Sequence, residues 1–157
     1  MMTIREANEN DIPRILQFVR ELALYEKLES EVVATPEQMH LWLFEKKKAS
    51  VLFCCNDGLE IGFALYFYNF STWKGCCGLY IEDLYIQKEY RGRGFGKALI
   101  TEIAQLANKE GCARVEWACL DWNQSSIDFY KSLGARPQKD WSVFRLTGPF
   151  LEAFSKS

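Results

Sequence analysis

Histidine is almost absent from this chain, which has one among 157 residues, and no C-x-x-C motif occurs although there are six cysteines. Histidine and closely spaced cysteines are the usual zinc ligands, so the sequence predicts no metal site. The cysteines form two adjacent pairs in apolar segments and two single residues. We expect reduced thiols that are buried as small hydrophobic side chains, as in a reducing compartment. They are Cys54, Cys55, Cys76, Cys77, Cys112 and Cys119.

An excess of basic charge and a long apolar run are missing as well. Lys and Arg number 19 against 21 Asp and Glu, and the sequence pI is about 5.5, which does not fit the basic stripe of a nucleic-acid binder. The longest apolar stretch, residues 63–68, is far shorter than the roughly 20 residues that cross a bilayer. Residues 1–11 are too polar for a signal peptide. We expect a cytoplasmic protein without nucleic-acid or membrane partners.

What the chain does have is enough apolar sequence for one core. Hydrophobic residues make up 48% of it, and a domain of about 150 residues buries roughly 68 to 70% of its unfolded surface. No repeat, linker or low-complexity tract interrupts the sequence. The sequence therefore predicts a single domain over residues 1–157.

The hydrophobic pattern alternates between the strand period and the helix period. Three β-rich segments in the middle of the chain are separated by turn signals, which predicts antiparallel hairpins. Thr35 begins the sequence Thr-Pro-Glu-Gln, which is typical of a helix N-terminus. The predicted strands are 3–6, 50–56, 61–70, 79–86, 114–119 and 141–146, and the predicted helices begin after Asp11, Thr35, Gly96 and Asn123.

A glycine-rich segment, Arg91-Gly-Arg-Gly-Phe-Gly96, lies between the predicted strand 79–86 and a predicted helix. Glycines at the start of a helix let a ligand approach the backbone N–H groups, and the helix dipole favours phosphate. The spacing is neither G-x-G-x-x-G nor G-x-x-x-x-G-K-[ST], which excludes the two usual nucleotide motifs. A phosphate loop of another kind and a simple tight turn remain open on this pattern alone.

The loop Arg91-x-x-Gly94-x-Gly96 resembles the pyrophosphate loop of the GCN5-related acetyltransferases. Further segments resemble the spermidine/spermine N-acetyltransferase family within it, and its thialysine N-epsilon-acetyltransferase branch in particular. The resemblance implies an α/β (α+β) fold, a mixed and mostly antiparallel sheet flanked by helices. The segments are Glu21-Leu-Ala-Leu-Tyr-Glu26, Ser71-Thr-Trp-Lys-Gly75, Ile81-Glu-Asp-Leu-Tyr-Ile86, Leu120-Asp-Trp-Asn-Gln124 and Phe129-Tyr-Lys-Ser-Leu-Gly-Ala135.

The resemblance also implies acetyl coenzyme A as cosubstrate. Backbone groups of a strand edge would pair with its pantetheine arm, the glycine-rich loop would hold its pyrophosphate, and the start of a later helix would also touch it. Asn123 independently fits the N-cap of that helix. The implied residues are Leu84, Tyr85 and Ile86 on the strand; Arg91, Gly92, Arg93, Gly94, Phe95, Gly96 and Lys97 in the loop; and Asn123, Gln124, Ser125 and Ser126.

Acetylation of an amine requires two proton transfers. A protonated alkylamine with a pKa of about 10.4 must lose a proton before it attacks the thioester, and the leaving thiolate must gain one. By resemblance, Tyr130 occupies the position of the proton donor. We expect Glu82 to accept the proton of the amine, or instead to bind its cation. The N–H of Tyr85 could polarise the thioester carbonyl.

Substrate contacts are implied at Tyr25, Glu26, Trp73 and Trp141, with Glu82 and Asp83 beside them. Polyamine-specific relatives carry an acidic residue where this chain has Ser71, which favours a shorter amine such as a diamine or thialysine. The resulting prediction is an acetyl-CoA-dependent N-acetyltransferase that acts on a small primary amine and forms a homodimer. A protein or peptide acetyltransferase and a non-catalytic acetyl-CoA sensor are the alternatives.

Overall fold

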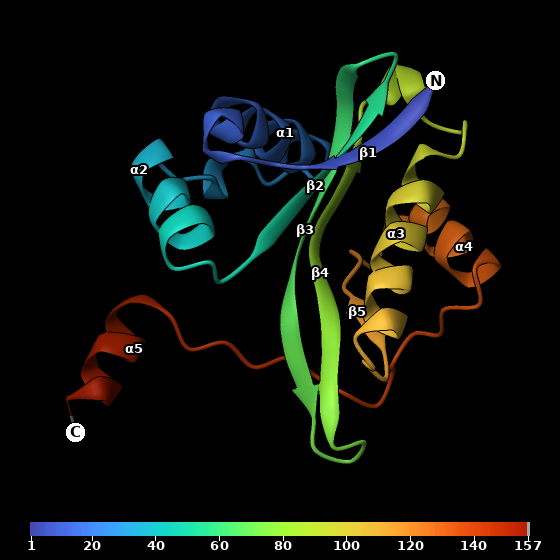
Figure 1. Ribbon diagram of the computed structural model, residues 1–157. Helices are drawn as coiled ribbons and strands as arrows, with labels where there is room; N and C mark the ends of the chain where they lie inside the picture. The colour runs from blue at the N-terminus through green and yellow to red at the C-terminus, as the bar shows by residue number, and fades with distance from the viewer. Residues whose placement is uncertain (157) are drawn as a thin grey trace. The chain divides into compact units, whose positions relative to one another are not determined.

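A computed structural model describes residues 1–156. It contains two compact units, Met1–Ala118 and Cys119–Ser157, which are described one after the other. Within residues 1–156, no helix combines the length and the apolar character that spanning a membrane requires. Figure 1 labels the helices and strands of both units.

The first unit is built on a five-stranded sheet in the order β1-β2-β3-β4-β5. Strands β1 to β4 are antiparallel, whereas β5 runs parallel to β4. Asp57 and Gly58 turn the chain between β2 and β3 with positive φ angles of 51° and 83°, as a two-residue hairpin requires. The strands are β1 (Met2–Glu6), β2 (Ser50–Asn56), β3 (Leu59–Ser71), β4 (Cys76–Ile86) and β5 (Val115–Trp117).

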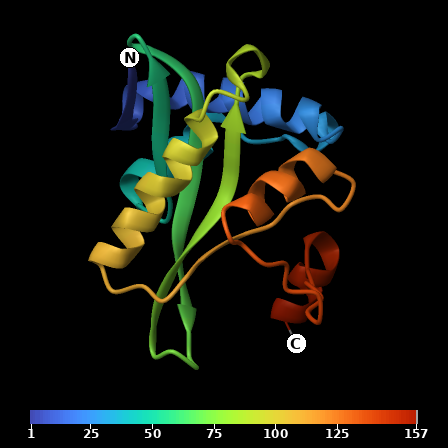
Figure 2. The same ribbon diagram turned by 90° about the vertical axis from the view of Figure 1, so that its right-hand side faces the viewer.

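Helices cover both faces of this sheet, as Figures 1 and 2 show. On one face lie α1 (Ile12–Tyr25) and α2 (Pro36–Met39), which continues as a π-helix over His40–Glu45. On the other face lies α3 (Phe95–Lys109). Short 3-10 turns occur at Glu9–Asp11, Glu29–Glu31 and Lys88–Tyr90.

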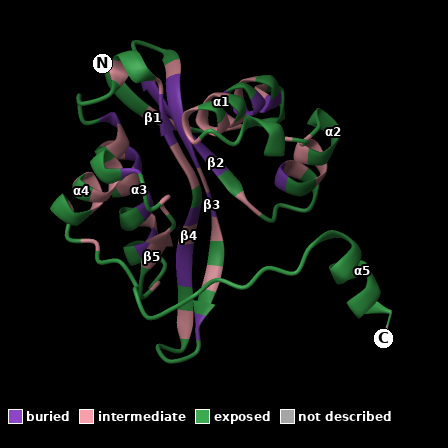
Figure 3. Ribbon diagram, turned by 180° about the vertical axis from the view of Figure 1, so that it is seen from behind, coloured by how far each residue is buried: buried purple, intermediate pink, exposed green. Residues whose placement is uncertain are grey.

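Two apolar cores hold the helices to the sheet, and the buried residues concentrate along the strands between them (Figure 3). On the α1 face, Phe18 is fully buried and its ring lies 5.7 Å from that of Phe63, a stacked arrangement. On the α3 face, Leu99 and Ile103 are fully buried against β4 residues such as Ile81. Side chains of this size stabilise the fold by roughly 1.5–3 kcal/mol each.

A β-bulge at Glu82 changes which side chains at the C-terminal end of β4 lie on each face of the sheet. Ile81 pairs with Tyr66 and Asp83 with Leu65, so Glu82 is an extra residue without a partner on β3. Before the bulge, Ile81 packs on the α3 face; after it, Tyr85 packs on the α1 face. Without the extra residue, strict alternation would place residues 83 and 85 on the α3 face.

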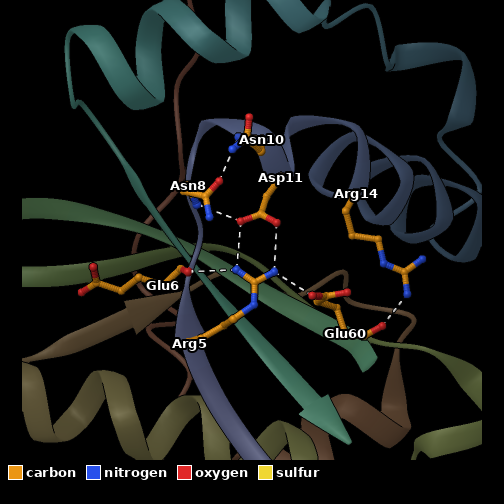
Figure 4. A network of polar contacts seen from close by, with 7 residues as sticks. All are labelled: Arg5, Glu6, Asn8, Asn10, Asp11, Arg14 and Glu60. Carbon is orange, nitrogen blue, oxygen red and sulfur yellow. Dashed lines mark hydrogen bonds and ion pairs between the residues drawn. The ribbon is translucent and has the colours of Figure 1, made fainter. Parts of the chain in front are cut away.

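A polar network ties β1 to the start of α1 (Figure 4). Arg5 donates two hydrogen bonds of 2.9 Å to the carboxylate of Asp11 and one of 2.6 Å to Glu60. The side chain of Asn8 caps the turn before α1, together with Asp11 in a capping box. Asp11 stands at the N-cap position of α1, but the expectation that it caps this helix is wrong, because its side chain makes no capping hydrogen bond there and accepts instead from the Asn8 N–H and from Arg5. At α2 the predicted Thr35 cap is confirmed, with Gln38 completing its capping box.

The second unit contains α4 (Gln124–Ser132) and α5 (Gly148–Ser155). The predicted strand 141–146 is wrong: within residues 1–156 this segment has no strand pairing, and Trp141 and Phe144 are largely exposed. A strand-like pattern is insufficient because a β-strand needs a neighbour for its backbone hydrogen bonds. Helix α5 was not expected from the sequence.

Candidate active site

One edge of β4 lacks a strand partner at its C-terminal end. The pairing of β4 with β5 ends where Ile81 meets Trp117, while β3 continues beside β4 as far as Ile86. Among the described residues, the segment from Glu82 to Ile86 therefore has a strand on one side only. Its other side presents backbone groups to which an extended ligand could bind.

The pairing pattern tells which backbone groups face this open edge. Gln87 donates its N–H to the carbonyl of Ile61 at 2.9 Å, which makes Ile86 and Gly62 a non-hydrogen-bonded pair. Because the two pair types alternate, Leu84 and Ile86 direct their backbone groups to the open edge, whereas those of Tyr85 face β3. The expected role of the Tyr85 N–H at a thioester carbonyl is therefore wrong, and the neighbouring Leu84 N–H is better placed.

The glycine-rich loop leads from this edge into α3. Gly92 and Gly94 have φ angles of 74° and 88°, a backbone conformation that disfavours other residues. The first intrahelical hydrogen bond joins Ala98 N–H to Gly94 C=O at 3.0 Å, so the N–H groups before Ala98 are directed out of the helix end. A Cβ on Gly96 would meet only Ile86, at 3.8 Å, which shows that the space before the helix is open.

These features fit the cosubstrate that the sequence implies. A strand edge without a strand partner suits the amide groups of a pantetheine arm, and a glycine-rich helix N-terminus suits a pyrophosphate. The distance between the two is short, because Ile86 and Gly92 are only six residues apart in the chain. The residues present are therefore those that coenzyme A requires.

The side chain of Arg91 fixes the loop to the rest of the unit. Its Nε donates to the carbonyl of Ile86 at 2.8 Å, one of the backbone groups at the open edge. Its guanidinium lies 4.6 Å from the ring of Tyr25 and 5.5 Å from that of Tyr85. Arg91 thus joins the end of α1, the end of β4 and the loop, an arrangement that cation–π contacts stabilise.

Carboxylates gather where β4 meets the end of α1. Glu82 is exposed at the bulge, whereas Asp83 is half-buried. Burial raises the pKa of Asp83 to about 7, and the negative charges of Glu82 and Glu26 add to this effect. Burial also raises the pKa of Glu26. The site therefore contains a carboxyl group that titrates near neutral pH, a common property of catalytic groups.

Further polar contacts at this point were not predicted from the sequence. Gln87 donates to the carboxylate of Glu21 at 3.3 Å. Burial, with the contribution of Glu21, raises the pKa of the Tyr85 hydroxyl to about 12. The only sequence signal was that Glu21 and Tyr25 are four residues apart on one helix face.

The predicted substrate residue Trp73, with Ser71 close to it in the chain, lies at the other end of the sheet. Trp73 is 88% exposed in the turn between β3 and β4. Cys76 and Asp83 are seven strand residues apart, or roughly 23 Å at 3.3 Å per residue, so Trp73 does not meet Asp83 within one chain. Ser71 is buried in the same turn, and its hydroxyl accepts a hydrogen bond from the Lys74 N–H at 3.2 Å.

The remaining predicted residues belong to the second unit. Asn123 is confirmed as the N-cap of α4, since its side chain accepts a hydrogen bond from the Ser126 N–H at 3.4 Å. Tyr130 lies two turns further on and is half-buried, with its ring 5.5 Å from that of Phe129. Trp141 is 70% exposed.

Cys54, Cys55, Cys76, Cys77 and Cys112 are free thiols. Cys54 and Cys55 are buried, and burial raises the pKa of Cys54 to about 11, which makes it an inert thiol. The expectation that all six are buried is wrong for the other four: Cys76, Cys112 and Cys119 are only partly buried, and Cys77, near the hairpin end of β4, is exposed. Residues 1–156 contain no group of three or more His, Cys, Asp or Glu arranged to hold a metal ion.

Comparisons with known proteins agree with this geometry. The thialysine N-epsilon-acetyltransferase of Bos taurus is 38% identical over 157 residues, which cover 92% of each chain. The L-ornithine N5-acetyltransferase NATA1 of Arabidopsis thaliana is 45% identical over 101 residues, or 64% of this chain and 44% of that protein.

Among solved structures, an integron cassette protein from V. cholerae matches with a TM-score of 0.82 at 24% identity, covering 99% of this chain and 98% of the other. That likeness shows the fold. The family model described as the acetyltransferase (GNAT) family matches residues 15–135. The predicted fold class and family are confirmed by these matches. The chain belongs to the acetyltransferase (GNAT) family.

Proposed function

We propose that this N-acetyltransferase moves an acetyl group from acetyl-CoA to the primary amine of a small, lysine-like or diamine acceptor. The observation that carries the proposal is the open edge of β4, which leads directly into the glycine-rich loop at the start of α3. Relatives named for thialysine and ornithine acetylation support a small acceptor. The family match over residues 15–135 includes parts of both units, which supports one catalytic domain.

In this proposal the backbone of Leu84 and Ile86 binds the pantetheine arm. The N–H groups of Phe95, Gly96 and Lys97 bind the pyrophosphate, assisted by the positive end of the α3 dipole. Asn123 to Ser126, at the start of α4, supply further contacts. Arg91 keeps the loop against Tyr25 and thereby holds the two binding segments in a fixed relation.

Direct transfer then needs three further contributions. The Leu84 N–H stabilises the negative charge that develops on the thioester oxygen. A carboxylate of the Glu82–Asp83 pair takes the proton of the amine, and Tyr130 returns a proton to the departing sulfur. Binding of both substrates in attack geometry supplies the rest of the acceleration, without a covalent enzyme intermediate.

The carboxylates also determine which acceptor fits. Glu26, Glu82 and Asp83 form one negative region that suits a single ammonium group with its aliphatic chain against Tyr25. A long polycation would need carboxylates spaced further along its length. The hydroxyl of Ser71 is engaged in its turn and adds no charge. We therefore expect thialysine, ornithine or a short diamine to be better acceptors than spermine.

The position of Trp73 in the chain supports the proposed homodimer. Within one chain it lies at the opposite end of β4 from Asp83, so its predicted substrate contact requires the site of a second copy. The hairpin that carries it also exposes Phe70 and Tyr68, which are apolar groups suited to an interface. We propose a dimer in which Trp73 and Trp141 line the acceptor channel. A cytoplasmic location belongs to the same proposal, supported by the buried free thiols of Cys54 and Cys55, which suit a reducing compartment.

A panel of amines with coenzyme A release as the readout tests the function. Turnover with thialysine, ornithine or a diamine, and weak turnover with spermine, is the expected result. Preference for peptide lysines would indicate a protein acetyltransferase instead. Acetyl-CoA binding without turnover of any amine or peptide would indicate a sensor and contradict the proposal.

A further inference from the structure

The surroundings of the Asp83 carboxylate differ from those of the other carboxylates at the end of β4. This difference affects which group accepts the proton of the acceptor amine. The sequence assigns that step to Glu82 and gives Asp83 only a contact with the substrate. The inference that follows rests on the proposed function, because it concerns the same reaction at the same site.

The β-bulge separates the two neighbouring carboxylates. Glu82 is the extra residue, and its side chain is exposed. Asp83 resumes the pairing with β3 opposite Leu65, which packs on the α1 face. Side chains on one strand alternate, so Asp83 lies on the same face as Tyr85, toward the end of α1. The bulge thus directs Asp83 to where the resemblance places the acceptor, and leaves Glu82 in solvent.

The surroundings of Asp83 contain negative charge and no paired cation. From β4 the nearest charge is Glu82, and from α1 it is Glu26. The next groups on α1 and on the loop are Glu21, which accepts from Gln87, and Arg91, whose Nε donates to the Ile86 carbonyl. Among the described residues, the charges that act on the Asp83 carboxylate are those of Glu82 and Glu26, and both are negative.

Asp11 in the same unit shows what a paired aspartate is like. Two hydrogen bonds of 2.9 Å from Arg5 hold its carboxylate, and they lower its pKa. Asp83 has the opposite environment, burial without a cation, which raises its pKa to about 7. A paired carboxylate is a poor proton acceptor, whereas one that titrates near neutral pH is close to the optimum for general base catalysis.

Asp83 is also close to the reacting atoms of the proposed reaction. Leu84, the next residue, directs its N–H to the open edge where the thioester oxygen would lie. One residue of a strand spans about 3.3 Å, so the carboxylate of Asp83 and this N–H can act on the same reaction centre. An ammonium group that enters beside Tyr25 meets Asp83 and Glu26 together.

We propose that Asp83, which the bulge at Glu82 directs to the face of Tyr85, accepts the proton of the acceptor amine, while Glu82 and Glu26 act as positioning residues beside it. The amine loses one proton to the Asp83 carboxylate, and its lone pair forms the new N–C bond. The C–S bond then breaks with its electron pair on sulfur, which takes a proton from Tyr130. Asp83 releases its proton to solvent before the next turnover.

The kinetic test measures kcat/KM for thialysine between pH 5.5 and 9.5. The wild type should show an ascending limb that levels off above about pH 7. In Asp83→Asn, kcat/KM should fall by about 10²–10⁴-fold at pH 7.5 and keep rising with the free amine toward pH 10. Glu82→Gln and Glu26→Gln should retain the ascending limb of the pH profile. The limb should move to lower pH in both, because each variant removes a negative charge beside Asp83 that raises its pKa. Glu37→Gln, which removes one exposed negative charge on α2, is the control and should leave the profile unchanged.

A second readout does not depend on turnover. Carboxyl ¹³C resonances of labelled protein, compared with Asp83→Asn, should show one aspartate that titrates near pH 7. Titration of Asp83 near pH 4, or loss of the ascending limb in Glu82→Gln with its retention in Asp83→Asn, overturns the proposal while the proposed function stands. If the wild type acetylates no amine, the proposed function fails, and the assignment to Asp83 fails with it.

Discussion

The burial of Asp83 has a consequence for stability that requires no substrate. Its pKa of about 7 in the folded state compares with 3.8 for a free aspartate. Between pH 3.8 and 7 the folded protein keeps a proton that the unfolded chain has released. The free energy of unfolding therefore falls as the pH rises through this window, by up to 1.36 kcal/mol per pH unit. Summed over about three units, the loss is roughly 4 kcal/mol, part of which belongs to the repulsion by Glu82 and Glu26.

Asp83→Asn removes this cost, because asparagine has no proton to lose. Urea unfolding followed by tryptophan fluorescence at pH 4, 6 and 8 measures the effect. We expect wild type and variant to differ little at pH 4, and the variant to be about 2–4 kcal/mol more stable at pH 8. Asp140→Asn controls for the loss of one exposed negative charge. The quantity that decides is the difference in unfolding free energy between Asp83→Asn and the wild type. If this difference is no larger at pH 8 than at pH 4, the reasoning is refuted.

Three other predictions concern the loop, the polar network and the second unit. Gly94→Val should abolish acetyl-CoA binding in isothermal titration calorimetry. The control Gly111→Val, at the other end of α3 with a similar φ of 76°, should lower stability and leave the affinity for acetyl-CoA unchanged. Equal loss of binding in both variants would contradict the proposed loop contact. Asp11→Asn should lower the free energy of unfolding by about 1–2 kcal/mol at pH 7, because the ion pair between Asp11 and Arg5 is only partly exposed. This loss should shrink as the pH falls below about 4, where the Asp11 carboxylate of the wild type gains a proton. A loss that does not depend on pH would show that the ion pair is not its cause. Tyr130→Phe should lower kcat at least tenfold with an unchanged dissociation constant for acetyl-CoA, and unaltered turnover would remove the proton-donor role.

The elements that the sequence predicts well are those with local causes. The Thr35 cap and the turn at Asp57–Gly58 follow from residue types with specific backbone preferences. The glycine-rich loop was also found, because the φ angles of Gly92 and Gly94 are ones that only glycine adopts readily.

The features that could not be predicted depend on partners distant in the chain. The bulge at Glu82 results from pairing with Tyr66 and Leu65, and no local pattern distinguishes Glu82 from Asp83. For the same reason the role of the Tyr85 N–H was assigned to the wrong residue: which backbone groups face an open edge depends on strand register. The segment 141–146 has the composition of a strand, but composition does not supply a neighbouring strand.

The central claim is that the open edge of β4 and the start of α3 bind acetyl-CoA. Titration of ¹⁵N-labelled protein with coenzyme A, followed by amide NMR, tests it most directly. The account predicts the largest shifts at Leu84 and Ile86 on the strand and at Phe95, Gly96 and Lys97 in the first turn of α3. Binding with these five amides unshifted and the largest changes elsewhere in the chain would contradict it.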